Sequence, residues 1–349
     1  MLRKFRQSTA VLLATLGLGA ALPAQGQEVE ILFNTYASHG HPWNADVVFP
    51  WFEDVTKATG GRVTFNVPPA SLAPPPEQYK GVVRGVFDAA YINLVFVQNF
   101  AELVQLSSLP LGTFSAQGNS RALWETYQEY FAEAGEFDDV HLVALYVGLP
   151  GDIMLRRKGT GVSGNFRGIK TYAIPGSAAQ LLDGVGAAVV SAPGVQAYEV
   201  ISSGTVDVYA GLALYDFEAF NVFQYAQKAL MVPGGLSAPS FALFVNKDRW
   251  AALSPEDQQT VMDMAQSHLV PNVGAFDAYA RQSKTHAEAL GIEIDQAPDA
   301  LMAAFRPSAD ELDAAWIAKA EAKGVDGRAA LDFYRSRAKA YAEALAEED

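Results

Sequence analysis

The chain has 349 residues, half of them hydrophobic, a formal net charge of −14 and no cysteine. Without cysteine there can be no disulfide, no thiolate metal site, no cysteine nucleophile and no lipid anchor on an N-terminal cysteine. The acidic balance argues against binding to nucleic acid or to anionic membranes, so we predict no nucleic-acid partner. A chain of this length is sufficient for two domains with large cores.

Residues 1–26 have the pattern of a signal peptide. Arg3, Lys4 and Arg6 precede an apolar run over 10–22, and small residues follow at 24–26. The run is too short for a good membrane span, so we expect cleavage before Gln27 and export of a soluble protein. Loss of the three cations takes the formal charge from −14 to −17.

Strands and helices are predicted to alternate through the first part of the mature chain. Apolar and alternating segments predict strands over 29–35, 62–67, 87–92 and 140–147. Helical periodicity predicts helices over 44–58, 77–84 and 120–131. Residues 148–151, with the sequence GLPG, are expected to lead from one lobe into the next.

The segment 165–211 is predicted to be a compact βαβαβ unit. Its strands are expected over 169–173, 187–190 and 205–209, with short helices between them. Parallel strands of this kind bind ligands at their carboxyl ends, against helix N-termini. The turn Pro175-Gly176-Ser177 is therefore a predicted binding edge.

A short pattern occurs twice and favours two similar lobes. Tyr79 is followed by Gly85 and Asp88, and Tyr198 is followed at the same spacing by Gly204 and Asp207. Each copy is typical of a helix that ends at glycine before a buried strand. The repetition of the two aspartates favours a structural role over a catalytic carboxylate pair.

The last third of the chain is predicted to be mostly helical. We expect a helix over 212–227 and a strand over 240–246. Ser254, followed by Pro255 and two acids, predicts the start of a long helix that reaches about residue 290, kinks at Pro271 and bridges two lobes. Ser308 with Glu311 predicts a capping box and a new helix, and 326–346 is expected to form the last one.

Catalytic motifs are absent from the sequence. There is no Gly-x-Ser-x-Gly elbow, no His-Glu-x-x-His, no Walker loop and no Gly-x-Gly-x-x-Gly between a strand and a helix. His39 and His41, with Asp46, could bind a metal, but a His-x-His in a loop more often packs or hydrogen-bonds. We predict no metal, no cofactor and no enzymatic activity.

Aromatic residues are enriched at the ends of predicted strands. They are Tyr36, Trp43, Tyr91, Tyr146, Tyr172, Tyr209, Tyr215 and Phe217. Each one alone is more often a core residue than a ligand contact. Their shared position predicts that two or three of them line a pocket.

Four segments carry a resemblance to a known family. They are GRVTFNVPPASLAPPPEQYKGVVRGVFDAAY, FRGIKTYAIPGS, GVGAAVVSAPGVQAYEVISSGTVD and FALFVNKDRWAALSPEDQQTV. In this order, and together with a signal peptide, they resemble the DctP-type solute-binding subunits of tripartite ATP-independent periplasmic (TRAP) transporters. The resemblance covers nearly all of the mature chain.

The resemblance implies a two-lobed α/β periplasmic binding protein, of the type II-like or Venus flytrap kind, with a long helix bridging the lobes. It implies a monomer in the periplasm of a Gram-negative bacterium, which captures a small organic solute and delivers it to an ion-gradient-driven permease. We expect the first lobe over 27–150 and 237–278, the second over 151–236 and 279–325, and a C-terminal helix over 326–349.

One position departs from the family pattern. The family usually has arginine in the strand before the turn, where it binds the solute carboxylate, whereas this chain has Tyr172. A carboxylate could still be bound by Arg156, Arg157 or the helix N-terminus at Ser177. A neutral polyol, a sugar-like molecule, a cation or an aromatic solute could also suit the tyrosines.

The residues predicted to bind the solute lie after the first and third strands and around the second lobe's turn. They are His39, Trp43, Tyr91, Asn93, Tyr172, Pro175, Gly176, Ser177, Tyr209 and Tyr215. Three alternatives remain: a binding protein of an ABC transporter, an exported hydrolase that uses Asp88, Asp207 or a histidine, and a ligand-bound partner for a sensor kinase.

Overall fold

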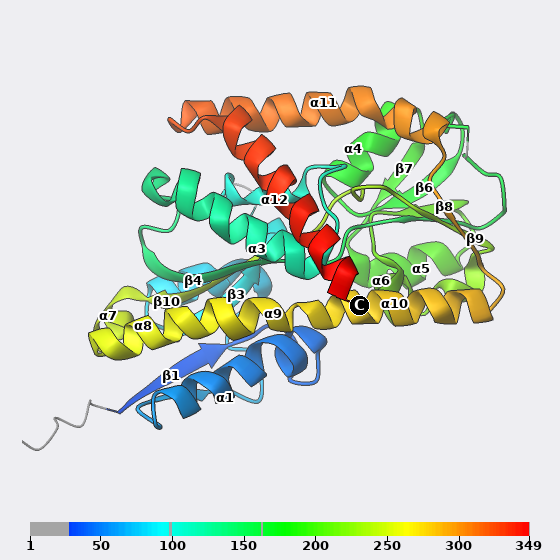
Figure 1. The fold of residues 1–349 in the computed structure, drawn as a ribbon. Helices are drawn as coiled ribbons and strands as arrows, with labels where there is room; N and C mark the ends of the chain where they lie inside the picture. The colour runs from blue at the N-terminus through cyan, green and yellow to red at the C-terminus, as the bar shows by residue number, and fades with distance from the viewer. Residues whose placement is uncertain (1–27, 98–99, 162, 349) are drawn as a thin grey trace, which may run out of the picture.

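The computed structural model describes residues 28–97, 100–161 and 163–348. The predicted signal peptide lies outside the described residues. The described chain forms two sheets, each covered by helices on both faces (Figure 1). We call the five-stranded sheet with its helices the first lobe and the six-stranded sheet with its helices the second lobe.

The first lobe contains a mixed sheet in the order β2-β1-β3-β10-β4. Its strands are β1 (Val29–Asn34), β2 (Val63–Asn66), β3 (Ala89–Asn93), β4 (Val140–Val147) and β10 (Ser240–Asn246). β1 pairs in parallel with β2 and β3, and β10 runs antiparallel between β3 and β4. Each of these five strands was expected from the sequence.

The second lobe contains a sheet in the order β11-β9-β5-β8-β6-β7. Its strands are β5 (Ile153–Leu155), β6 (Lys170–Ala173), β7 (Ala188–Ser191), β8 (Val208–Ala210), β9 (Lys228–Met231) and β11 (Glu293–Gln296). β6 pairs in parallel with β7 and β8, which confirms the predicted βαβαβ unit. The short strands β5, β9 and β11 were not expected.

The helices follow the predicted order, apart from one helix over 247–251 that was not expected and errors in several bounds. They are α1 (Phe49–Ala58), α2 (Gln78–Val83), α3 (Ala116–Thr126), α4 (Ser177–Gly184), α5 (Ala197–Ser202), α6 (Leu214–Ala219) and α7 (Lys247–Ala251). The helix predicted over 212–227 ends at Ala219, because the chain then turns into β9. Leu214 and Phe217 bury its one apolar face.

A helical run from Pro255 to Ala289 bridges the two lobes, as predicted (Figure 1). It consists of α8 (Pro255–Met264), a π-helical turn η9 (Ala265–Leu269), α9 (Val270–Asn272) and α10 (Gly274–Ala289). The Ser254 side chain accepts a hydrogen bond from the Asp257 N–H at its start. The run contributes Val261, Leu269 and Phe276 to the first lobe's core and Ala287 to the second.

The next helix, α11 (Asp299–Ala322), also spans both lobes and corrects a prediction. Ser308 does not cap a new helix, because α11 continues through Pro307 and Ser308. Its early residues Leu301 and Phe305 pack in the second lobe's core, and its late residues Trp316 and Ile317 pack in the first. The last helix, α12 (Gly327–Glu348), returns along α3 of the first lobe.

The two segments that cross between the sheets are hydrogen-bonded to each other. The Gly148 N–H donates to Pro239 O, and the Gly151 N–H donates to Ser237 O, both at 2.8 Å. A Cβ on Gly151 would lie 2.4 Å from Gly211 O, so only glycine allows this close approach. Residues 148–151 and 236–239 form the paired connection between the two lobes, which we call the hinge.

Among the described residues, no helix is long and apolar enough to cross a membrane.

Candidate functional site

The loop that follows β1 is fixed by a buried hydrogen-bond network. The Thr35 hydroxyl lies 3.2 Å from the Tyr91 hydroxyl and 3.1 Å from the Asn44 amide nitrogen. The same Asn44 nitrogen donates to Ser38 O at 2.8 Å. The carboxyl ends of β1 and β3 are therefore joined, and the loop is held in one conformation above them.

A small pocket of about 180 Å³ lies at this edge of the first lobe. Residues 35–39 form one wall and residues 68–71 form the other. His39, one of the predicted site residues, joins the two loops because its Nε2 lies 2.9 Å from Pro68 O. The His39 side chain is exposed and holds the two loops together at the rim of the small pocket.

Three tyrosine rings lie next to one another beneath this edge. The Tyr36 and Tyr91 ring centroids are 5.4 Å apart, and those of Tyr91 and Tyr146 are 6.4 Å apart. Tyr91 and Tyr146 are fully buried, whereas Tyr36 is partly exposed and lines the small pocket. We call Tyr36, Tyr91 and Tyr146 the tyrosine cluster.

The hydroxyls of the cluster remain protonated. Burial raises the pKa of all three phenols, and the proximity of Tyr91 raises the pKa of Tyr36 and of Tyr146 further. A hydrogen bond with the Asn93 backbone opposes the rise at Tyr36, and one with Thr35 opposes it at Tyr91. The Tyr146 hydroxyl is buried and has no hydrogen-bond partner among the described residues.

Trp43 and Asn93 have mainly structural contacts. The Trp43 ring stacks on Phe276 of the bridging helix, with centroids 4.0 Å apart, and also contacts the Tyr146 and Phe241 rings. The Asn93 side chain accepts a hydrogen bond from the Val95 N–H at 3.1 Å, which turns the chain after β3. Asn93 is partly exposed at the strand end, where it was expected.

In the second lobe, the Tyr172 ring is fully buried, and its hydroxyl donates to Pro193 O at 3.3 Å. Burial raises its pKa, and the nearby Asp216 raises it further. Asp216 accepts a hydrogen bond from the Ala213 N–H, and burial raises the pKa of its carboxyl to about 6. This edge therefore has a carboxyl beside Tyr172, in place of a cation.

Tyr209 lies beside Tyr172, because the two residues are paired in register on β8 and β6, whereas Tyr215 lies on α6. Tyr209 is fully buried, and its hydroxyl donates to Tyr225 O at 3.0 Å. Tyr215 stacks on Tyr279 of the bridging helix, with centroids 5.2 Å apart. Tyr215 thus helps to join α6 to α10.

The turn before α4 reaches across to the first lobe. Gly176 has a φ of 101°, which favours glycine, and both Pro175 and Gly176 are exposed. The Ser177 hydroxyl donates to Ser108 O at 2.6 Å, so this predicted site residue joins the lobes directly. Opening the lobes at this point would break that bond.

Both arginines suggested as substitutes for the missing one have partners within the second lobe. Arg156 donates to the carbonyls of Val206 and Ile201, and its guanidinium lies over the Tyr209 ring. Arg157 forms an ion pair with Asp207 at 3.0 Å, at the start of β8. Both side chains lie near the residues that precede β8, away from the carboxyl ends of β6 and β8.

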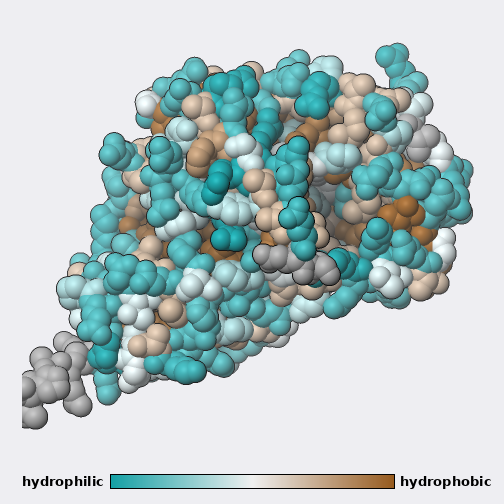
Figure 2. Space-filling model, viewed as in Figure 1, coloured by the Kyte–Doolittle hydropathy of each residue, from teal (hydrophilic) through white to brown (hydrophobic). Residues whose placement is uncertain are grey.

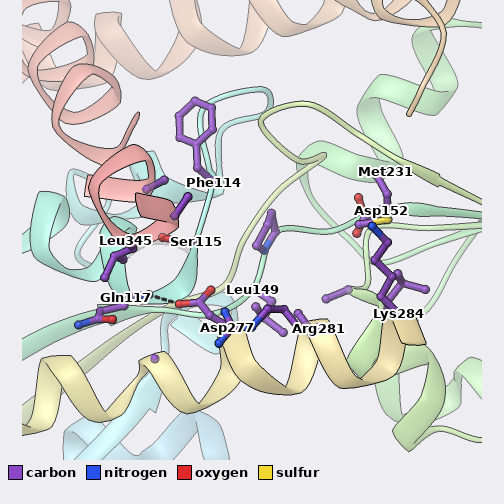
Figure 3. A pocket seen from close by; sticks show the side chains of 17 residues that line it. Phe114, Ser115, Gln117, Leu149, Asp152, Met231, Asp277, Arg281, Lys284 and Leu345 are labelled. Carbon is purple, nitrogen blue, oxygen red and sulfur yellow. Dashed lines mark hydrogen bonds between the residues drawn. The ribbon is translucent and has the colours of Figure 1, made fainter. Parts of the chain in front are cut away.

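A cavity of about 610 Å³ lies between the lobes beside the hinge (Figure 3). We call it the hinge cavity; Figure 2 shows the surface hollowed between the end of α12 and the second lobe. Its lining includes Phe114, Ser115, Gln117, Leu149, Pro150, Asp152, Leu214, Met231, Asp277, Arg281, Lys284, Ala342 and Leu345. None of the ten predicted site residues lines it.

Asp152 is the buried acid of the hinge cavity. It is 5 % exposed, and its Oδ1 accepts a hydrogen bond from the Val232 N–H at 2.9 Å. Burial raises the pKa of its carboxyl to about 7, although the hydrogen bond opposes the rise. No sequence motif pointed to this residue.

The carboxylates considered for catalysis have structural partners. Asp88 accepts a hydrogen bond from the Leu32 N–H at 2.8 Å and forms an ion pair with Arg249 at 3.1 Å. Asp207 pairs with Arg157, in the other sheet. Within the described residues, no group of three or more His, Asp or Glu side chains could hold a metal ion.

A family model described as bacterial extracellular solute-binding protein, family 7 (DctP) matches residues 33–319. The outer membrane transporter protein TsaT of Comamonas testosteroni is 38% identical over 332 residues, which is 94% of this chain and 98% of TsaT. These matches span nearly the whole described chain.

Solved structures show the same architecture. A TRAP periplasmic solute-binding protein from Bordetella bronchiseptica, with bound (R)- and (S)-mandelate, is 31% identical with a TM-score of 0.79; the match covers 89% of this chain and 99% of that one. A TRAP solute-binding protein from Rhodoferax ferrireducens, in complex with copurified benzoate, is 24% identical with a TM-score of 0.74, covering 91% and 99%. The second likeness establishes the fold alone.

Proposed function

Because the chain belongs to the DctP family of TRAP solute-binding proteins, whose members bind small solutes and work with membrane permeases, we propose that its solute is a small aromatic carboxylate. Two observations support this class of solute. The relative from Bordetella bronchiseptica binds mandelate, an aromatic hydroxy acid. In this chain, the edge of the first lobe is built from the tyrosine cluster.

The single observation that carries the proposal is the tyrosine cluster at the carboxyl ends of the first lobe's strands. Aromatic rings suit a planar apolar solute, and hydroxyls suit its polar end. We propose that the solute binds between this edge and the facing edge of the second lobe. The residues proposed to line this site remain His39, Trp43, Tyr91, Asn93, Tyr172, Pro175, Gly176, Ser177, Tyr209 and Tyr215.

Solute capture is proposed to work by lobe closure. A solute that contacts both lobes stabilises the closed state by its difference in affinity between the two states. We propose that residues 27–150 and 237–278 form the first lobe and that residues 151–236 and 279–325 form the second. We also propose that the protein acts as a periplasmic monomer, without catalysis or nucleic-acid binding. The permease then receives the solute from the closed form.

Thermal unfolding of the mature protein tests the proposed solute class. We expect mandelate, benzoate and 3-hydroxybenzoate to raise the melting temperature, because a ligand at about 100 times its Kd stabilises the folded state by about 2.7 kcal/mol. Succinate and mannitol serve as the non-aromatic controls. Stabilisation by the controls alone would contradict the proposal.

The same samples test for turnover. We expect mandelate to be recovered chemically unchanged after overnight incubation with the protein. Its conversion to another compound would instead favour an exported enzyme over a binding protein.

A further inference from the structure

The Tyr146 hydroxyl is a buried polar group without a protein acceptor or donor among the described residues. Its ring is fully buried at the penultimate position of β4, two residues before Gly148 of the hinge. A buried hydroxyl with no partner costs about 1 to 3 kcal/mol. Such a group in a folded protein needs an explanation, and a partner that comes from outside the chain supplies one.

The surroundings of the hydroxyl are consistent with a solute. Tyr146 stacks on Phe241, with ring centroids 5.2 Å apart, and lies against Trp43 at 5.3 Å. Tyr36 and Tyr91 lie close enough for their phenols to raise its pKa. Tyr36 and Thr35 also line the small pocket at the first lobe's edge, and the Tyr91 ring lies next to both the Tyr36 and the Tyr146 rings behind it.

We propose that the tyrosine cluster binds the solute's carboxylate through neutral hydroxyl donors, with Tyr146 donating the hydrogen bond that the protein leaves unused. The inference rests on the proposed function and names the groups that take over from the family's arginine. An uncharged donor set is sufficient for one carboxylate, because hydrogen bonds to a charged group contribute about 1.5 to 3 kcal/mol each.

A cation would be the alternative to the hydroxyls for neutralising the solute's carboxylate. Arg156 and Arg157, the cations considered from the sequence as substitutes, are bound to other groups. Arg281 and Lys284 line the hinge cavity, which none of the cluster residues lines. A carboxylate bound by hydroxyls alone should therefore show little salt dependence, whereas an arginine pair would weaken as salt screens it.

Tyr146→Phe tests the inference because it removes only the hydroxyl. We expect Tyr146→Phe to bind mandelate at least tenfold more weakly by calorimetry, equivalent to about 1.4 kcal/mol. Its melting temperature without solute should be equal to or higher than that of the wild type, because the unpaired hydroxyl is gone. Mandelate affinity in the wild type should also stay within about twofold between low and high salt.

Tyr334→Phe is the matched control. Tyr334 is also buried and its hydroxyl also lacks a partner among the described residues, but it lies on α12 in a different core cluster from Tyr146. We expect Tyr334→Phe to bind mandelate like the wild type. Tyr36→Phe, at a partly exposed ring of the tyrosine cluster, provides a second test should Tyr146→Phe fold poorly.

Each outcome has a distinct meaning. If Tyr146→Phe and Tyr36→Phe both bind mandelate as tightly as the wild type does, the inference is overturned and the proposed solute class is left intact. Equal losses in Tyr146→Phe and Tyr334→Phe would also overturn it, since a general effect of removing a buried hydroxyl would then account for both. No binding of any aromatic acid by the wild type would overturn the inference and the proposed solute class together.

Discussion

At the scale of single residues, Asp152 beside the hinge should make the stability of the folded protein depend on pH. Its carboxyl has an ordinary pKa of 3.8 and a raised pKa of about 7 in the folded protein. Below about pH 4 it is protonated in both states, and between about 4 and 7 only the folded protein keeps the proton. The stability that the protonated group contributes is therefore lost as the pH rises through about 7.

Asp152→Asn should remove this dependence, since the amide oxygen can still accept the Val232 hydrogen bond. We expect the variant to match the wild type near pH 4 and to be more stable at pH 8, by at most about 4 kcal/mol. Urea unfolding across this pH range measures the difference. Asp183→Asn, at an exposed acid of α4, is the control that should follow the wild type throughout. A constant difference at every pH would contradict the expectation.

Tyr172 illustrates the limit of sequence reasoning about a residue. The motif correctly indicated the carboxyl end of a parallel strand, and the structure has β6 there, with Asp216 beside the Tyr172 hydroxyl. The motif could not indicate that the ring is fully buried against α5 and α6. Which face of a strand a side chain occupies depends on the register with its neighbours, and a short buried strand has no alternation to reveal it.

At the scale of elements, Asp277 ties the bridging helix to α3. Its carboxylate accepts hydrogen bonds from the N–H groups of Ala116 at 2.7 Å and Gln117 at 3.0 Å, the latter drawn in Figure 3. These are the first two amides of α3, which have no partner within the helix. Ser115 caps the next free amide, that of Gly118, at 3.1 Å.

Asp277→Ala should therefore lower the free energy of unfolding by about 2 kcal/mol, because it exposes two amides of α3 and removes a charge from the positive end of the helix dipole. Glu288→Ala, at an exposed acid of the same bridging helix, should change it by less than about 0.5 kcal/mol. Chemical denaturation of both variants compares them. Similar values for the two would show that Asp277 contributes nothing specific.

The elements that the sequence predicted well are those with a strong local signal. β4 and β10 have the expected bounds because both are long apolar runs. The start of the bridging helix was predicted because Ser254 and Pro255 form a strong local helix start. The three missed strands are three or four residues long, and β11 is polar, so neither length nor periodicity identifies them.

The misplaced start of α11 has a different cause. Ser308 and Glu311 have the spacing of a capping box, and Pro307 removes a backbone donor from the helix interior. The helix nevertheless continues, because its two halves bury Phe305 in one lobe and Trp316 in the other. Burial on both sides of Pro307 outweighs the local signals, which amount to about 1 kcal/mol for the cap and about 3 kcal/mol for a proline inside a helix.

At the scale of the whole molecule, the hinge cavity should affect lobe closure. Residues 149, 150 and 152 line it, together with residues of both lobes and the bridging helix. None of the residues proposed for the solute site lines it, so we expect the solute crevice on the other side of the hinge. A larger side chain that fills the hinge cavity should then hold the lobes apart on the cavity's side of the hinge. It should bring them together on the side of the solute crevice.

Ala342→Phe, on the wall that α12 contributes, tests this mechanical relation. We expect it to lower the radius of gyration without solute and to tighten mandelate binding by about threefold to tenfold, because a larger closed population lowers the apparent Kd. Ala344→Phe, at an exposed position of the same helix outside the cavity lining, should behave like the wild type. Weaker binding by Ala342→Phe would place the crevice on the cavity's own side.

The strand order of the first lobe has a consequence for how the protein matures. β10 lies between β3 and β4, yet it follows all but one of the second lobe's strands in the chain. A chain emerging from its N-terminus can therefore pair five of the second lobe's six strands while the first lobe's sheet is still divided into β2-β1-β3 and a solitary β4. The edges of β3 and β4 therefore stay exposed, and must be kept from pairing with other chains, until β10 has been made, even though most of the second lobe's sheet can already have formed.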